Sequence, residues 1–108
     1  MIAPAWNNGS HWPSGGGYGI KINRSDRDSY FDRSWKHITL ELVDSTRNIS
    51  VEVNVDKASF WGPRCRELIN QEIGRWLIRQ KLAPWPKDAP PQINIEHISG
   101  NRFRAVAM

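Results

Sequence analysis

The sequence is poor in cysteine and in long apolar runs, and both shortages limit what the protein can be. Among 108 residues there is a single cysteine, Cys65, so no disulfide can form within the chain, which favours a reducing compartment. No apolar run approaches the roughly 18 residues that a membrane-spanning helix needs. The opening residues, MIAPAWNNGS, have neither the basic nor the apolar segment of a secretory signal. We therefore expect a cytoplasmic protein that is not associated with a membrane.

Charge is absent from residues 1–17. This segment is rich in Gly, Asn, Ser and Pro, and its only bulky aromatic anchors are Trp6 and Trp12. Such a composition is typical of a mobile segment. We predict a flexible tail over residues 1–17 and a single domain over residues 18–108, because a chain of this length buries one modest core.

Four glycines, Gly15, Gly16, Gly17 and Gly19, lead directly into an alternation of apolar residues. A phosphate-binding loop places such glycines between a strand and the N-terminus of a helix, whose free N–H groups bind the anion. Here the glycines precede a strand, and neither the dinucleotide-binding fingerprint nor the lysine of a P-loop is present. The run is therefore interpreted as a hinge between the tail and the domain.

Apolar residues alternate with polar residues in five segments, which is the pattern of half-buried strands. The first segment covers residues 18–22. Residues 36–43 and 49–55 flank the turn DSTRN and predict an antiparallel hairpin. Residues 92–98 and 102–108 flank the turn SGN and predict a second hairpin.

Residues 24–34, RSDRDSYFDRS, mix charges of both signs between two of these predicted strands. We interpret the segment as a polar connection. Its two adjacent aromatic residues, Tyr30 and Phe31, are expected to attach it to the core.

The period of the pattern changes after Gly62-Pro63, where the proline suits the first position of a helix. An apolar stripe follows at helical spacing and consists of Cys65, Leu68, Ile69, Ile73, Trp76 and Leu77. This predicts a helix from Pro63 to Lys81, which ends before the proline-rich APWPKDAPP, with Cys65 as a buried structural thiol. The predicted fold class is α+β: an antiparallel sheet, in chain order β-β-β-α-β-β, with one helix packed on one face.

The net charge of +4 comes entirely from residues 55–108, which hold nine basic and five acidic side chains. Arg64, Arg75 and Arg79, with Gln71 between them, form one flank of the predicted helix. Arginines at this spacing can follow a phosphate backbone, whereas a solvated helix flank is the plainer interpretation. Nucleic-acid binding through Arg64, Gln71, Arg75 and Arg79 is therefore the alternative function.

Patterns of catalytic and metal-binding residues are missing. The three histidines, His11, His37 and His97, lack ligand spacing with one another or with Cys65. Glu72 lies at the edge of the apolar stripe without a second acid–base group at a matching site, so we expect it to pair with an arginine. The sequence predicts no catalytic residue, no metal and no cofactor, and favours a protein that is not an enzyme; a nuclease-like enzyme is the third alternative.

Six tryptophans are more than a core of this size can bury. Trp76 lies on the helix stripe, where we expect it to be buried, but Trp6, Trp12 and Trp85 fall outside the predicted elements. Aromatic side chains near a surface often anchor a protein partner. The alternative interpretation is that these tryptophans only cover a small core. The leading prediction is a small interaction module that binds a protein, or a second copy of itself, through Trp6, Trp12 and Trp85.

Three segments, SFWGPRCREL, EIGRWLIRQKLAPWPKDAPP and GNRFR, resemble short uncharacterised bacterial proteins of the kind found on mobile elements and gene cassettes. The resemblance covers about the last half of the chain. It implies a bacterial accessory protein, and it implies no activity, cofactor or site residue.

Overall fold

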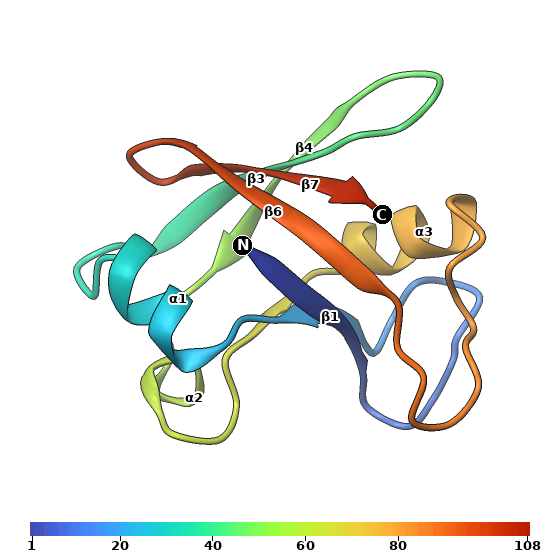
Figure 1. Cartoon of the computed structure of the whole chain (residues 1–108), viewed down its shortest axis with the longest axis horizontal. Coiled ribbons are helices and arrows are strands. Elements are labelled where there is room, and N and C mark those ends of the chain that lie inside the picture. Colours follow the sequence, from blue (N-terminus) through green and yellow to red (C-terminus); the bar gives the residue numbers. More distant parts are fainter.

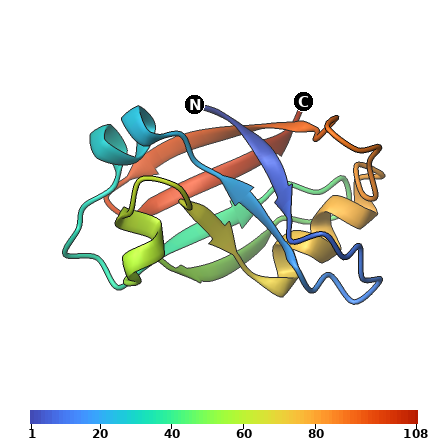
Figure 2. The same ribbon diagram turned by 90° about the horizontal axis from the view of Figure 1, so that it is seen from below.

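Strands dominate the structure, a computed structural model that describes residues 1–108 (Figure 1). The strands are β1 (Ile2–Asn7), β2 (Tyr18–Lys21), β3 (His37–Leu42), β4 (Ile49–Asn54), β5 (Glu67–Ile69), β6 (Gln92–Ser99) and β7 (Arg102–Ala107). The helices are α1 (Arg24–Tyr30), α2 (Ala58–Trp61) and α3 (Gln71–Arg79). Figure 2 shows α1 and α2 at one end of the molecule and α3 at the other end.

All seven strands form one sheet in the order β4-β3-β7-β6-β1-β2-β5. Each neighbouring pair is antiparallel except β3 and β7, which run parallel. The sheet curls until its two edge strands approach each other, and there the Asn70 side-chain amide, just after β5, donates to the Glu52 carbonyl of β4 at 3.1 Å. The result is a mixed, nearly closed barrel.

The predicted antiparallel sheet with one helix on one face is therefore wrong. The structure has two strands more than expected, β1 and β5, together with a parallel pair and three short helices. The physical reason is the number of strands in the sheet. With seven strands it curves round on itself, so the inner face of one part covers the inner face of another, and no helix is needed to cover a whole face.

Strand β1 lies within the sheet, so the prediction of a flexible tail over residues 1–17 is wrong for residues 2–7. The first half of β1 pairs with β6 and the second half pairs with β2. Ala3 and Ala5 point into the barrel and are only 1% and 4% exposed. Residues 2–7 of the segment that was expected to be mobile thus form a strand inside the sheet.

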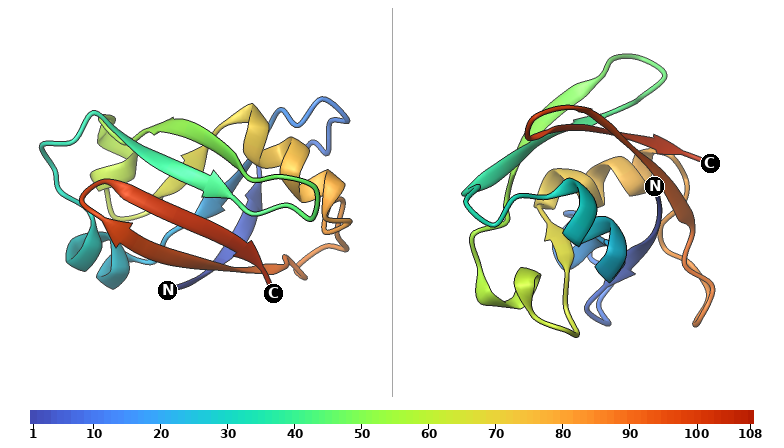
Figure 3. Two further views of the ribbon diagram at one scale, coloured as in Figure 1. Left: turned by 90° about the horizontal axis from the view of Figure 1, so that it is seen from above. Right: turned by 60° about the vertical axis from the view of Figure 1, so that its left-hand side comes forward.

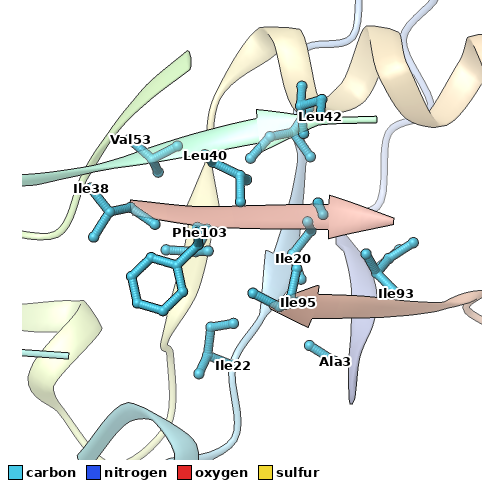
Figure 4. Close-up of a cluster of buried hydrophobic side chains, with 14 of the residues drawn as sticks. Ala3, Ile20, Ile22, Ile38, Leu40, Leu42, Val53, Ile93, Ile95 and Phe103 are labelled. Atoms are coloured by element: carbon cyan, nitrogen blue, oxygen red, sulfur yellow. The ribbon is translucent and has the colours of Figure 1, made fainter. Parts of the chain in front are cut away.

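The interior of the barrel is filled by side chains from the predicted strands, as Figure 4 shows. Both predicted hairpins are confirmed, with β3 paired to β4 and β6 paired to β7. The core includes inward residues of these hairpins and of β2, together with Ile22 just after β2, all of them buried: Ile20, Ile22, Ile38, Leu40, Leu42, Val53, Ile93, Ile95, Phe103 and Ala105. Alternation along each strand therefore directs one row of apolar side chains into a common core.

Helix α3 is shorter than the helix predicted over 63–81. The earlier part of that segment forms β5 instead, in which Leu68 is fully buried in the sheet. The helix begins after Asn70, whose side chain accepts a hydrogen bond from the Glu72 N–H at 2.8 Å. Cys65, expected to be buried on the helix stripe, lies in the loop before β5 and is exposed.

Helix α3 lies across one end of the barrel (Figure 3), and Trp76 fixes it there. Its side chain is fully buried, as predicted, and its indole N–H donates to the carbonyl of Val43 at 2.8 Å. Val43 directly follows β3, so this hydrogen bond joins the helix to the end of a core strand. Ile73 and Leu77 complete the buried face of the helix.

The loop between β1 and β2 packs on α3 through two glycines. A Cβ atom on Gly74 would lie 2.0 Å from the carbonyl oxygen of Gly15, and a Cβ on Gly15 would lie 2.5 Å from the carbonyl oxygen of Gln71. The side chains of Gln71 and Arg75 both donate to the carbonyl of Ser14, at 3.0 and 3.1 Å. Gly15 therefore allows close packing, and the interpretation of the glycine run as a hinge is wrong at this position.

Replacement of Trp76 by alanine tests how α3 is held. We expect Trp76→Ala to lower the free energy of unfolding by about 3–5 kcal/mol, because a buried aromatic side chain is removed. Urea denaturation followed by circular dichroism measures the change. Trp12→Ala is the control, since Trp12 is 57% exposed, and it should change stability by less than about 1 kcal/mol. Equal losses in the two variants would contradict the anchoring role.

Replacement of Gly74 by alanine tests the contact between the loop and α3. In the interior of an isolated helix, alanine is more favourable than glycine by about 1 kcal/mol. We expect the opposite sign here, a loss of about 1–3 kcal/mol, because the new methyl group overlaps the Gly15 carbonyl. Thermal unfolding measures the difference.

Gly16→Ala is the matched control in the same loop. A Cβ atom on Gly16 meets nothing closer than the Ser14 hydroxyl oxygen at 3.5 Å, which is an ordinary contact. Its stability should stay close to that of the wild-type chain. A Gly74→Ala variant more stable than wild type would show that the loop does not press on the helix.

Candidate functional site

An open pocket of 530 Å³ lies between the C-terminal end of α1 and the turn that joins β6 to β7. Its volume falls within the range of sites that hold small ligands or side chains. The residues that shape it come from three places: the end of α1, the turn that follows, and the β6–β7 hairpin. The residues that carry its chemistry are Tyr30, Phe31, Asp32, Arg33, Trp35 and His97.

Helix α1 places the first aromatic wall of the pocket. It begins after Asn23, whose side chain accepts a hydrogen bond from the Asp26 N–H at 2.8 Å. It ends at Tyr30, whose side chain is 44% exposed, and the chain then becomes extended at Phe31, which is buried. The prediction that Tyr30 and Phe31 attach this segment to the core is thus confirmed for Phe31 only.

A buried arginine fixes α1 to α2. Arg27 is 5% exposed, and one of its terminal nitrogens donates to the carbonyls of Phe60 and Gly62 at 3.0 and 2.8 Å. The guanidinium also pairs with Asp28 at 3.0 Å and lies 5.4 Å from the ring centroid of Trp61. Because this planar group is held by two carbonyls around α2 and by Asp28 in its own helix, α1 has little freedom to shift relative to α2.

A tight turn after α1 sets the charged rim of the pocket. The Trp35 N–H donates to the Asp32 carbonyl at 3.1 Å, while one carboxylate oxygen of Asp32 accepts from the Ser34 N–H at 2.8 Å and from its hydroxyl at 2.7 Å. The hydrogen bond from the Ser34 N–H, and to a smaller extent the one from its hydroxyl, holds the pKa of Asp32 below its ordinary value. The carboxylate is therefore ionised at neutral pH.

Five aromatic rings contact one another around the pocket. Phe31 stacks on Phe103 with ring centroids 4.7 Å apart, and Trp35 lies 6.4 Å from Phe31. On the other side, His97 lies 5.0 Å from Phe103 and 5.9 Å from Tyr30. The two phenylalanines are buried, whereas Tyr30 and His97 are exposed. The pocket therefore has an aromatic base that belongs to the core and aromatic sides that face solvent.

The three tryptophans predicted to bind a partner have different surroundings. Trp85 packs edge-on against His11 and Tyr18, with centroids 5.1 and 5.6 Å apart, and so attaches the loop between β1 and β2 to the segment after α3. Trp6 is partly buried on β1, and Trp12 is exposed. None of the three lines the pocket. Their role in binding stays a prediction.

The predicted basic flank is divided between two elements. Arg64 lies in the loop before β5, so only Gln71, Arg75 and Arg79 belong to α3. Gln71 and Arg75 bind the loop between β1 and β2, as described above, and Arg79 donates to the Asp44 carboxylate at 2.9 Å. The helical part of the flank is therefore engaged in contacts within the chain.

Titratable side chains are paired rather than clustered on the helix. The expected pairing of Glu72 with an arginine is confirmed, because its carboxylate accepts a hydrogen bond from Arg75. No group of three or more His, Cys, Asp or Glu side chains is placed to hold a metal ion.

Sequence reasoning missed the pocket because its walls come from distant parts of the chain. Tyr30 and His97 belong to α1 and β6, and nothing in their spacing indicates that they meet. One local signal was available. Asn23 followed by Asp26 is typical of a helix start and would have identified α1.

Comparison with protein-family models, curated proteins and solved structures finds no match for this chain. The resemblance to bacterial proteins of mobile elements and gene cassettes therefore stays a prediction. None of the helices has the length and apolar character needed to cross a membrane.

The pair of Arg79 with Asp44 makes an acid-sensitive contribution to stability. The hydrogen bond from Arg79 lowers the pKa of Asp44, so the ionised carboxylate stabilises the folded state above a pH of about 4, the ordinary value for aspartate. This contribution is lost as the pH falls through the lowered pKa. We expect Asp44→Asn to lower the melting temperature at pH 7, and the difference from wild type to shrink below about pH 4.

Thermal unfolding at pH values between 7 and 3 measures this difference. Asp88→Asn is the control, because Asp88 is exposed and takes part in none of the ion pairs. A difference between Asp44→Asn and wild type that does not change with pH would contradict the ionic origin of the effect.

Proposed function

We propose that this chain is a small binding module without catalytic activity, and that it holds a segment of a partner protein in the pocket beside α1. The observation that carries the proposal is the pocket itself, in which exposed aromatic side chains stand around an aromatic base. A cytoplasmic location, which the single cysteine favours, is part of the proposal.

The residue types of the pocket support a protein partner. Tyrosine, tryptophan and arginine are the residues that most often contribute large shares of the binding energy in protein interfaces, and the pocket contains Tyr30, Trp35 and Arg33. These side chains stand on a base that is already ordered by core contacts. Less conformational entropy is therefore lost on binding than on a mobile loop.

Nucleic-acid binding through Arg64, Gln71, Arg75 and Arg79 is the alternative. It has less support, because Arg75 and Arg79 already have carboxylate partners and a phosphate would have to compete with them. An aromatic pocket can also stack a nucleic-acid base. Nucleic acid therefore belongs among the ligands to be compared.

Selection from a random peptide library displayed on phage tests the proposal. We expect the wild-type chain to enrich peptides that bind with micromolar Kd values in isothermal titration. Tyr30→Ala should weaken their binding by at least about tenfold, or roughly 1.4 kcal/mol, because an exposed aromatic wall of the pocket is removed.

Ile69→Ala is the control for a general effect of losing an exposed apolar side chain outside the pocket, and it should bind the same peptides as wild type. A second comparison uses mixed single-stranded DNA and RNA at low salt. If no peptide is enriched and the oligonucleotides bind with a steep salt dependence, the protein-binding proposal is wrong and the nucleic-acid alternative takes its place.

A further inference from the structure

The carboxylate of Asp32 carries an uncompensated charge at the rim of the pocket. Asp32 takes part in none of the ion pairs of the structure. Its hydrogen bonds come from the neutral groups of Ser34. A ligand that enters the pocket therefore meets a carboxylate that is not already engaged in an ion pair.

The cationic side chain next to Asp32 in the sequence is engaged elsewhere. The guanidinium of Arg33 lies 5.5 Å from the ring centroid of Trp61, within the distance of a cation–π contact. Trp61 lies in α2 and is not part of the pocket wall. Arg33 also lines the pocket, but its guanidinium has this aromatic partner in α2 and no ion pair with Asp32.

The aromatic sides of the pocket attract the same kind of group as the carboxylate does. The faces of tyrosine and tryptophan rings carry partial negative charge and bind cations at distances of up to about 6 Å. Tyr30, Trp35 and Asp32 all line the pocket, so a ligand bound there meets the two aromatic side chains together with the carboxylate. The combination favours a cation and disfavours a phosphate, which the carboxylate repels.

The hydrogen bonds that Asp32 already accepts favour lysine over arginine as the side chain that it binds. One carboxylate oxygen already accepts two hydrogen bonds from Ser34, which occupy both of its lone pairs, and only the other oxygen is free. Arginine pairs best when its two parallel N–H groups reach both oxygens. The ammonium of lysine is a compact charge that needs one oxygen only.

We infer that the pocket beside α1 binds the ammonium group of a lysine side chain of a partner protein, with Asp32 as the counter-charge and Tyr30 and Trp35 as the aromatic walls. The inference rests on the proposed function and adds the chemistry of the bound group. It predicts that affinity follows the positive charge of the ligand and not its apolar length.

Titration of the ¹⁵N-labelled full chain, followed by NMR, tests the inference directly. The probes are the N-acetyl methylamides of lysine, of norleucine, which has the same carbon chain without the ammonium, and of arginine. We expect the lysine derivative to shift the Trp35 indole N–H signal and the backbone signals of Phe31 and Asp32. The norleucine derivative should leave them unchanged, and the arginine derivative should need a higher concentration than the lysine derivative for the same shift.

Asp32→Asn is the decisive variant. Asparagine keeps a side-chain oxygen that accepts the hydrogen bonds of Ser34, so the turn is preserved while the charge is removed. Binding of the lysine derivative should weaken by at least about tenfold. Asp88→Asn removes an exposed carboxylate outside the pocket and should bind like wild type.

Three results would overturn the inference: equal shifts with the norleucine derivative, unchanged binding by Asp32→Asn, or tighter binding of guanosine monophosphate than of the lysine derivative. The proposed function is judged separately. Enriched peptides that depend on Tyr30 but bind equally well after every lysine is replaced by norleucine would leave the protein-binding function standing and remove the lysine inference alone.

Discussion

One strand holds the two parts of the sheet together. β1 pairs with β6 through residues 2–4 and with β2 through residues 5–7, and no other strand links β2 and β5 to the rest of the sheet. Pro4 lies where the strand changes partners, at the end of one ladder, which is a position at which a strand tolerates a missing N–H. The curling of the sheet and the approach of β4 to β5 both depend on this junction.

The barrel in turn supports the pocket. Phe103 of β7 provides the surface on which Phe31 stacks, so the base of the pocket is continuous with the core. Arg27 joins α1 to the carbonyls around α2, and this places the turn that carries Asp32. A pocket built from a helix end, a turn and a hairpin keeps its shape only while the sheet that joins these pieces stays closed.

Local patterns predicted the strands whose inward residues are large and branched, because alternation of isoleucine, leucine and valine is a strong signal. They failed for β1, whose inward residues are Ala3 and Ala5, and for β5, which has only three residues. Leu68 also fits the helical spacing of α3, so the short apolar run was assigned to the wrong element. The candidate site depends on contacts between distant segments, and no local pattern indicates these.

The position of β1 also determines when the protein can fold. Ile2 pairs with Asn94, so β1 needs a partner that is synthesised much later than β1 itself. At a translation rate of about 5–20 residues per second, β1 waits roughly 5 to 20 seconds on the ribosome before β6 exists. During this time its apolar side chains, including Trp6, are uncovered. The barrel therefore cannot close before β6 is synthesised, and until then the unpaired edge of β1 favours aggregation of the nascent chain.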